Sequence, residues 1–337
     1  MKNVFLVVII SFISLIGFGQ TATDYWFQGL DKYNLRDYRG AIQDYSKAIE
    51  LSPRDTIFYY YRGMAKAQLQ DFTGAITDFT KSIEFNPKSS SAYLERGIAK
   101  IYLQDFKGAI PDFDKAIELS PLSAMAYFYR GSSRVSLKDY AGAIPDFDKT
   151  IELAPQRLEA YFYRGSSKMY LQDFKGAIPD FDKAIELSPQ SAEAYFSRGT
   201  SKAYLQDFKG AILDFDKAIE LAPQSVEAYF YRGTSKTYLQ DFQGAIPDFD
   251  KVIKLAPQSA EAYFYRGSSK MSLKDYKGAI PDFDKAIELY PKYADAYYNR
   301  GSIKYVLGQN DSGCLDWKEA ANMGHKTASE AFERYCK

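Results

Sequence analysis

Prolines recur along this chain at a fixed step of 34 residues. The series consists of Pro53, Pro87, Pro121, Pro155, Pro189, Pro223, Pro257 and Pro291. Glycines follow the same step from Gly29 to Gly301. A fixed period of this length indicates one small structural unit that is copied along the chain. Because stacked units form one elongated body with a continuous core, we expect function on a surface that many units share rather than in a single pocket.

The charge balance excludes one broad class of function. Lys plus Arg and Asp plus Glu both total 43, so the formal net charge is zero. A nucleic-acid binder needs a basic face for the phosphates, and we therefore expect no nucleic-acid partner. The aromatic fraction of 16%, with 29 Tyr and 24 Phe, instead supplies apolar surface for a repeated core.

The first 19 residues differ from the rest of the chain. Lys2 gives a positive start, and an apolar run from Val4 to Phe18 is interrupted only by two serines and a glycine. A small-x-small cleavage site, Gly17-Phe18-Gly19, precedes Gln20. These features predict a signal peptide at residues 1–19 and an exported protein, either periplasmic or secreted. The run is shorter than the roughly 20 apolar residues of a spanning helix, so we expect no stable membrane insertion after the signal is removed.

One unit of the repeat, Leu158 to Ser191, shows the pattern of two amphipathic helices. Apolar residues in its second half recur at steps of three and four, and the first half follows the same rule less clearly. Asp173 stands where it can cap the start of the second helix, and Pro189 ends that helix. Gly165 is placed where the two helices approach closely. Each unit is therefore predicted to be a helical hairpin.

With these positions in register, the chain resembles the tetratricopeptide repeat (TPR) family. The resemblance covers nine units within residues 22–327, in which the small, aromatic and proline positions coincide. It implies an all-α, right-handed superhelical solenoid of nine TPR hairpins. The segment Lys326 to Tyr335 is predicted to form a C-terminal cap helix, with residues 328–337 as its C-terminal part, because the end of a solenoid needs a polar-backed cap.

Two positions depart from the pattern of the TPR family. An arginine such as Arg164 replaces the usual aliphatic residue, and Lys168 replaces the usual aromatic one. Arg164 and Asp180 lie at nearly the same height in an antiparallel hairpin, so we predict a structural ion pair between them. Asp146 of the preceding unit is the alternative partner. A clamp for a charged ligand is the functional alternative, but an unpaired charge inside the hairpin would be costly.

The resemblance implies that the first helices line a concave surface that binds ligands. We therefore predict a non-enzymatic scaffold that binds a protein or peptide segment on this face. The candidate contacts are a phenylalanine column and a neighbouring hydroxyl column, namely Phe128, Phe162, Phe196, Phe230, Phe264, Ser132, Ser166, Thr200, Thr234 and Ser268. The alternatives are a glycan or small-molecule binder, a passive structural spacer, and phenylalanines that only pack between repeats.

The sequence carries no motif for catalysis or metal binding. The single histidine, His325, follows Gly324 at a helix end, and no phosphate loop or nucleophile elbow is present. Asp180 and Asp182 are two residues apart on a helix and point to different faces, so they do not form an acid–base pair. We therefore predict that the protein is not an enzyme and needs no cofactor or metal.

The two cysteines, Cys314 and Cys336, both lie near the C-terminal end. Cys314 is near the start of the last repeat helix, and Cys336 ends the cap helix, which is expected to return antiparallel to it. In an exported protein two cysteines so placed can pair. We therefore predict a disulfide between them.

Overall fold

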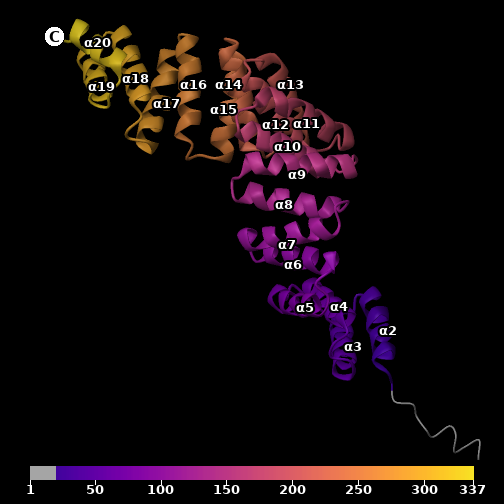
Figure 1. The fold of residues 1–337 in the computed structure, drawn as a ribbon. Coiled ribbons are helices and arrows are strands. Elements are labelled where there is room, and N and C mark those ends of the chain that lie inside the picture. The colour runs from indigo at the N-terminus through magenta and orange to yellow at the C-terminus, as the bar shows by residue number, and fades with distance from the viewer. Residues whose placement is uncertain (1–19) are drawn as a thin grey trace, which may run out of the picture. The chain divides into compact units, whose positions relative to one another are not determined.

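The computed structural model describes residues 20–337 and contains 19 α-helices, α2 to α20, within that range (Figure 1). The predicted signal peptide, residues 1–19, lies outside the described residues. The first helices of the hairpins are α2 (Ala22–Asn34), α4 (Thr56–Gln68), α6 (Ser90–Tyr102), α8 (Ala124–Ser136), α10 (Leu158–Tyr170), α12 (Ala192–Tyr204), α14 (Val226–Tyr238), α16 (Ala260–Ser272) and α18 (Ala294–Val306). The second helices are α3 (Tyr38–Leu51), α5 (Phe72–Phe85), α7 (Phe106–Leu119), α9 (Tyr140–Leu153), α11 (Phe174–Leu187), α13 (Phe208–Leu221), α15 (Phe242–Leu255), α17 (Tyr276–Leu289) and α19 (Asn310–Asn322). The cap helix is α20 (Lys326–Tyr335).

The paired helices form a repeat solenoid, which divides into two compact units. The first unit ends at Ala160 and the second begins at Tyr161, so the boundary falls within α10. In the first unit each helix from α2 to α9 packs against the next one, and in the second unit the same order runs from α11 to α20. None of the described helices is long and apolar enough to cross a bilayer.

The first helices of each unit lie on its inner side. In the first unit α2, α4, α6 and α8 touch one another in turn, and in the second unit α12, α14, α16 and α18 do the same. The second helices of the described residues do not approach one another to this extent. We call the surface formed by the first helices of one unit its first-helix face. It corresponds to the surface that the sequence predicted to be concave.

Local signals in the sequence set the helix boundaries. The Asp173 carboxylate accepts a hydrogen bond from the Gly176 backbone N–H at 2.9 Å and so caps the start of α11. Ser191 caps α12 in the same way. Between the helices of a hairpin the chain passes through one left-handed residue, for example Gln206 with φ 63°. Only in the last hairpin is that residue a glycine, Gly308 with φ 79°.

The two helices of a hairpin meet at a glycine and an aromatic ring. A Cβ atom added to Gly97 would lie 2.6 Å from Cε1 of Phe113, closer than real contacts allow. Phe113 is fully buried, so its ring occupies the space that a larger residue at position 97 would need. The same ring position is filled along the chain by Tyr45, Phe79, Phe113, Phe147, Phe181, Phe215, Phe249, Phe283 and Trp317.

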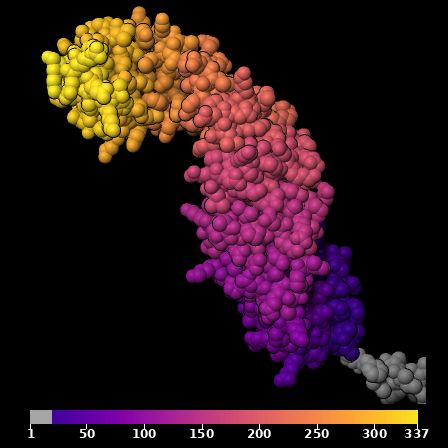
Figure 2. All heavy atoms as spheres, turned by 45° about the horizontal axis from the view of Figure 1, so that its top comes forward, coloured from indigo at the N-terminus to yellow at the C-terminus, as the bar shows by residue number. Residues whose placement is uncertain are grey.

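The C-terminal end of the second unit is closed by α20. Ala328 of α20 is fully buried beside Trp317, and Phe332 packs against the same cluster. The Cys314 and Cys336 sulfur atoms form a disulfide, with the two Cα atoms 5.7 Å apart. Figure 2 shows the cap helix at the far end of this unit, in yellow. Packing and a covalent bond together hold the last helix of the array.

Candidate functional site

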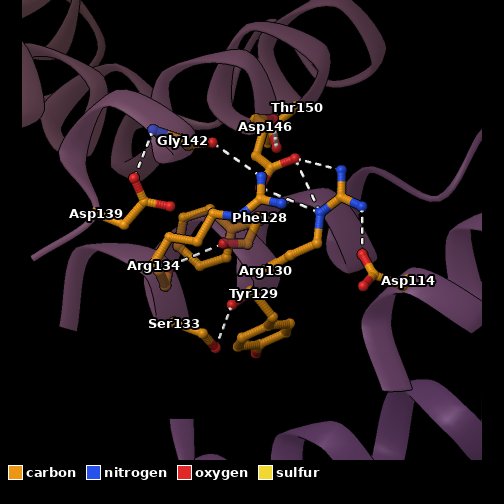
Figure 3. Close-up of polar contacts among 11 residues, drawn as sticks. Asp114, Phe128, Tyr129, Arg130, Ser133, Arg134, Asp139, Gly142, Asp146 and Thr150 are labelled. Atoms are coloured by element: carbon orange, nitrogen blue, oxygen red, sulfur yellow. Dashed lines mark hydrogen bonds and ion pairs between the residues drawn. The ribbon is translucent and has the colours of Figure 1, made fainter. Parts of the chain in front are cut away.

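A buried aspartate lies at the centre of the polar contacts inside each hairpin, as Figure 3 shows for α8 and α9. Asp146 is only 1% exposed. Its Oδ1 accepts a hydrogen bond from Arg130 Nη2 at 2.5 Å, and its Oδ2 accepts one from Arg134 Nη1 at 2.7 Å. Arg134 Nη1 also donates to the Gly142 backbone carbonyl at 2.9 Å. Two first-helix cations therefore hold one second-helix carboxylate.

The same arrangement contains the ion pair that the sequence predicted. Arg164 Nη2 lies 2.5 Å from Asp180 Oδ1, and Lys168 Nζ lies 2.8 Å from Asp180 Oδ2. Lysine thus replaces the usual aromatic residue because it serves as a second counter-ion for the buried carboxylate. This role was not predicted from the sequence, although the recurrence of Lys and Arg at the same position of the repeat was its signal.

Asp146, the alternative partner proposed from the sequence, forms its ion pairs within its own hairpin. Arg130 and Arg134 hold its carboxylate. Arg198 Nη1 reaches the second aspartate of the preceding hairpin, Asp182, at 2.6 Å from its Oδ1. Nearer the N-terminus the same reach ends on a hydroxyl, since Arg62 Nη1 donates to Ser46 Oγ at 3.1 Å and Arg96 Nη1 to Thr80 Oγ1 at 3.2 Å. Asp182 is on the half-exposed side of its helix, so the two aspartates do point to different faces, as expected.

Electrostatics around the arginines favour the charged form. Burial on its own would lower the pKa of the Arg198 guanidinium. Its hydrogen bonds to Asp214 and Asp182 outweigh burial, so the pKa lies above the ordinary value for arginine. The guanidinium also lies over the Tyr195 ring, 5.5 Å from its centroid. These partners are all within the chain, which indicates a structural network rather than a ligand clamp.

The predicted phenylalanine contacts lie on the first-helix side but are largely engaged within the fold. Phe196 has its ring centroid 5.9 Å from that of Phe215 and 5.7 Å from that of Tyr231 in the next hairpin. Phe162, Phe230 and Phe264 are half-buried against the second-helix rings in the same way. Phe128 is only 7% exposed, and the Arg157 guanidinium covers its ring at 3.8 Å from the centroid.

The hydroxyl column is partly occupied by backbone hydrogen bonds. Ser132 Oγ donates to the Phe128 carbonyl at 2.9 Å, and Thr234 Oγ1 donates to the Tyr231 carbonyl at 3.0 Å. Thr200 is only 7% exposed. The two remaining members of the column, Ser166 and Ser268, are half-buried. A role in ligand contact stays a prediction for both columns.

Two clefts open on the first-helix faces, one in each unit. The cleft in the second unit has a volume of about 540 Å³, and Phe230 and Thr234 line it together with Tyr204, Phe208 and Tyr238. The cleft in the first unit has a volume of about 510 Å³ and is built from the corresponding positions of α4, α5, α6 and α8. Equivalent clefts in separate units follow from the repeat, because each is formed by the same surface of successive hairpins.

Exposed tyrosines form part of both clefts and were not predicted from the sequence as contacts. Tyr204 stacks on Phe174 with ring centroids 4.4 Å apart, and Tyr238 stacks on Phe208 at 4.7 Å. Both tyrosines are exposed, at 60% and 68% respectively. Their 34-residue spacing was the available signal. A tyrosine ring that is held in place by stacking on a phenylalanine can bind a ligand on its open face with little further loss of side-chain entropy.

The single histidine, His325, has structural partners. His325 Nδ1 accepts a hydrogen bond from the Ala328 backbone N–H at 3.0 Å and so caps α20, while its Nε2 lies 3.3 Å from Asp295. Within residues 20–337, no group of three or more His, Cys, Asp or Glu side chains is arranged to hold a metal ion.

The comparison with protein families identifies the repeat. The tetratricopeptide repeat profile matches residues 28–90, 94–157, 164–226 and 230–294. These segments make up most of the sequence, and the chain belongs to the tetratricopeptide repeat family. Members of this family are generally non-catalytic scaffolds that bind proteins or peptides. No curated protein sequence matches this chain.

Three solved structures of similar fold are distant from this chain in sequence. The C-terminal part of a TPR repeat-containing protein from Cytophaga hutchinsonii is 20% identical, with 70% of this chain and 97% of that chain covered and a TM-score of 0.60. YrrB, described as a TPR protein with an unusual peptide-binding site, is 24% identical, with 55% and 95% covered and a TM-score of 0.52. A tetratricopeptide repeat protein from Parabacteroides merdae is 20% identical, with 74% and 99% covered and a TM-score of 0.52. At these identities the likeness shows the fold alone.

Replacing Asp214 with asparagine should strongly destabilise the hairpin of α12 and α13. Arg198 and Lys202 would lose the buried carboxylate that they share. Breaking a buried pair costs roughly 3–5 kcal/mol, and the access of both cations to water places the loss near the lower end. Amide hydrogen exchange of α12 and α13 measures the effect hairpin by hairpin.

The matched control for this variant is Asp182→Asn, because it removes a contact of the same arginine. Asp182 is 53% exposed, and an exposed pair contributes roughly 0–1 kcal/mol. Equal losses in the two variants would contradict the central role of the buried aspartate.

Reducing the Cys314–Cys336 disulfide should loosen α20 and leave the hairpins before α18 intact. A cross-link that closes a loop of this length contributes roughly 3 kcal/mol by the chain-entropy model. We expect faster amide exchange in α20 after reduction, and the same change in a Cys336→Ser variant without reductant. Unchanged exchange would mean that the packing of Ala328 and Phe332 is enough to hold the helix.

Proposed function

We propose that this protein is a non-catalytic scaffold that binds an extended protein or peptide segment along its first-helix face. The observation that carries the proposal is the pair of equivalent clefts, of about 540 and 510 Å³, in the two units. A segment that runs along the first-helix face of one unit can enter its cleft and contact neighbouring hairpins, and several weak contacts on one ligand add up to useful affinity. A compact ligand would use the cleft alone.

The exposed tyrosines support this proposal more directly than the phenylalanine column does. Tyr204 and Tyr238 offer open ring surface, whereas Phe196 and Phe230 are held by Phe215 and Phe249 behind them. The unusual peptide-binding site named for YrrB is a further support, since that protein shares this fold. The stacked tyrosines also suit the flat face of a sugar ring, so a glycan remains the second candidate ligand.

We also propose that the mature protein begins at Gln20 and acts in the periplasm or outside the cell. The apolar leader before Gln20 and the Cys314–Cys336 disulfide support this, because disulfides persist in oxidising compartments. The intact mass of the chain recovered from its natural source tests the proposal. We expect a chain that lacks residues 1–19 and carries no free thiol, whereas a full-length chain with two thiols would overturn it.

Selection from a random peptide library tests the proposed function. The mature chain, residues 20–337, is the target, and fluorescence anisotropy gives the Kd of each enriched peptide. Replacing both Tyr204 and Tyr238 with alanine should weaken binding of peptides that occupy the second-unit cleft by roughly tenfold or more. The melting temperature should change little, because both rings are largely exposed.

The control variant is Leu213→Ala, which removes an equally open apolar side chain, 70% exposed, from the second helix α13. It should leave binding unchanged. Phe196→Ala and Phe230→Ala test whether these rings bind the ligand or only pack in the core. A large loss of stability with intact binding would assign them to the core. Enrichment of no peptide, together with binding to an oligosaccharide panel, would favour the glycan. Binding to neither would favour a passive spacer.

A further inference from the structure

Glu95 is the one acidic residue in a column of first-helix residues that is otherwise uncharged. The equivalent positions carry Phe27, Tyr61, Tyr129, Tyr163, Ser197, Tyr231, Tyr265 and Asn299. Glu95 lies on α6 and lines the cleft of about 510 Å³ in the first unit. A carboxylate therefore stands where the second-unit cleft has the aromatic ring of Tyr231.

The walls around this carboxylate are mainly apolar and aromatic. Met64, Ile98 and Met125 line the cleft, and so do the rings of Tyr102 and Tyr129. Glu95 is itself half-buried, and desolvation raises the pKa of its carboxyl. A negative charge in such surroundings costs free energy unless a cation or several donors compensate it.

No partner within residues 20–337 compensates Glu95. Its side chain has neither an ion pair nor a hydrogen bond in the part of the chain that the structure describes, whereas the buried aspartates of the hairpins, such as Asp112, are held by two cations. The titratable groups around it are the tyrosines Tyr33 on α2, Tyr60 on α4, Tyr129 on α8 and Tyr102 on its own helix. Arg157, a cation of the same unit, lies over the Phe128 ring and pairs with Glu159.

We propose that this cleft binds a basic side chain, arginine or lysine, of the bound peptide segment, with Glu95 as its counter-ion. The inference rests on the proposed function and names a residue class that the ligand must carry. The ammonium or guanidinium would pair with the Glu95 carboxylate, while the methylene groups would pack on Met64, Ile98 and Met125.

The aromatic wall suits such a side chain. Tyr102 is 65% exposed and lies flat on Phe72, with ring centroids 4.5 Å apart, so its open face is held in place. A cation over an aromatic face gains electrostatic attraction. The first unit already contains this contact, because the Arg157 guanidinium lies 3.8 Å from the centroid of Phe128. The amide side chains of Gln68 and Gln70 at the same cleft supply further acceptors.

The test compares peptides selected on the wild-type chain with those selected on Glu95→Gln, which keeps the size and removes the charge. On the wild type we expect one position to be enriched in Arg or Lys, and on Glu95→Gln we expect this enrichment to disappear. For a selected arginine peptide, Glu95→Gln should weaken binding roughly tenfold. Replacing the peptide arginine with neutral citrulline should cause the same loss on the wild type and little further loss on Glu95→Gln.

The matched control is Glu118→Gln, on the second helix α7 of the same unit. Its carboxylate is 66% exposed and pairs with Lys115, so the change in net charge is the same but lies away from the cleft. It should leave peptide binding unchanged. Peptides selected without a basic preference, or equal binding by the Glu95→Gln and Glu118→Gln variants, would overturn the inference and leave the proposed function standing. If no peptide is enriched on any variant, both the inference and the proposed peptide-binding function are contradicted.

Stability gives an independent readout. Because the folded pKa of Glu95 is raised, the stabilising contribution of this group is present at low pH and is lost as pH rises through the folded pKa. Glu95→Gln should therefore melt at a higher temperature than the wild type at pH 7, and the difference should shrink as pH falls toward 4. A lower melting temperature at pH 7 would show that Glu95 has a structural role, and would overturn the inference.

Discussion

Each hairpin of this protein is built around a carboxylate that the fold removes from water. Asp214, for example, is 3% exposed and is compensated by Arg198 and Lys202 from the facing helix. Such a group cannot remain unpaired in a protein interior, so the two helices must stay in the register that brings the three side chains together. The arginine also reaches the exposed Asp182 of the preceding hairpin. One cluster thus fixes the pairing within a hairpin and joins it to its neighbour.

This network determines what the rest of each hairpin can do. The charged groups fill the middle of the helix pair, and the glycine and aromatic ring beside them, such as Gly97 and Phe113, set how closely the helices approach. Because the interior uses nearly the same residues in every unit, variation falls mainly at exposed positions, and those on the first helices are among them. The clefts and the stacked tyrosines are found there. A constant interior and a variable face are what a binding scaffold requires.

Glu95 is informative because it breaks the rule that the rest of the chain follows. The aspartates buried in the hairpins have cationic partners, yet this half-buried glutamate faces a cleft without one among the described residues. A half-buried carboxylate with neither an ion pair nor a hydrogen bond within residues 20–337 fits a binding site better than a structural contact. Binding of a basic side chain would place a counter-ion next to the carboxylate and would offset the desolvation cost of its burial.

The sequence alone determined the repeat, the helical hairpin and the positions of the cap helix and the disulfide, because each depends on local spacing that the chain shows directly. Periodicity at 34 residues identifies the unit, and Pro189 and Asp173 mark where its helices end and begin. It also predicted the pairing of Arg164 with Asp180, since both lie in one short hairpin. The tertiary structure decided what lies between hairpins. Three features depend on how successive hairpins pack: Arg198 contacts Asp182, Tyr238 stacks on Phe208, and Glu95 has no partner among residues 20–337. The distances across that packing are not encoded in the spacing of residues along the chain.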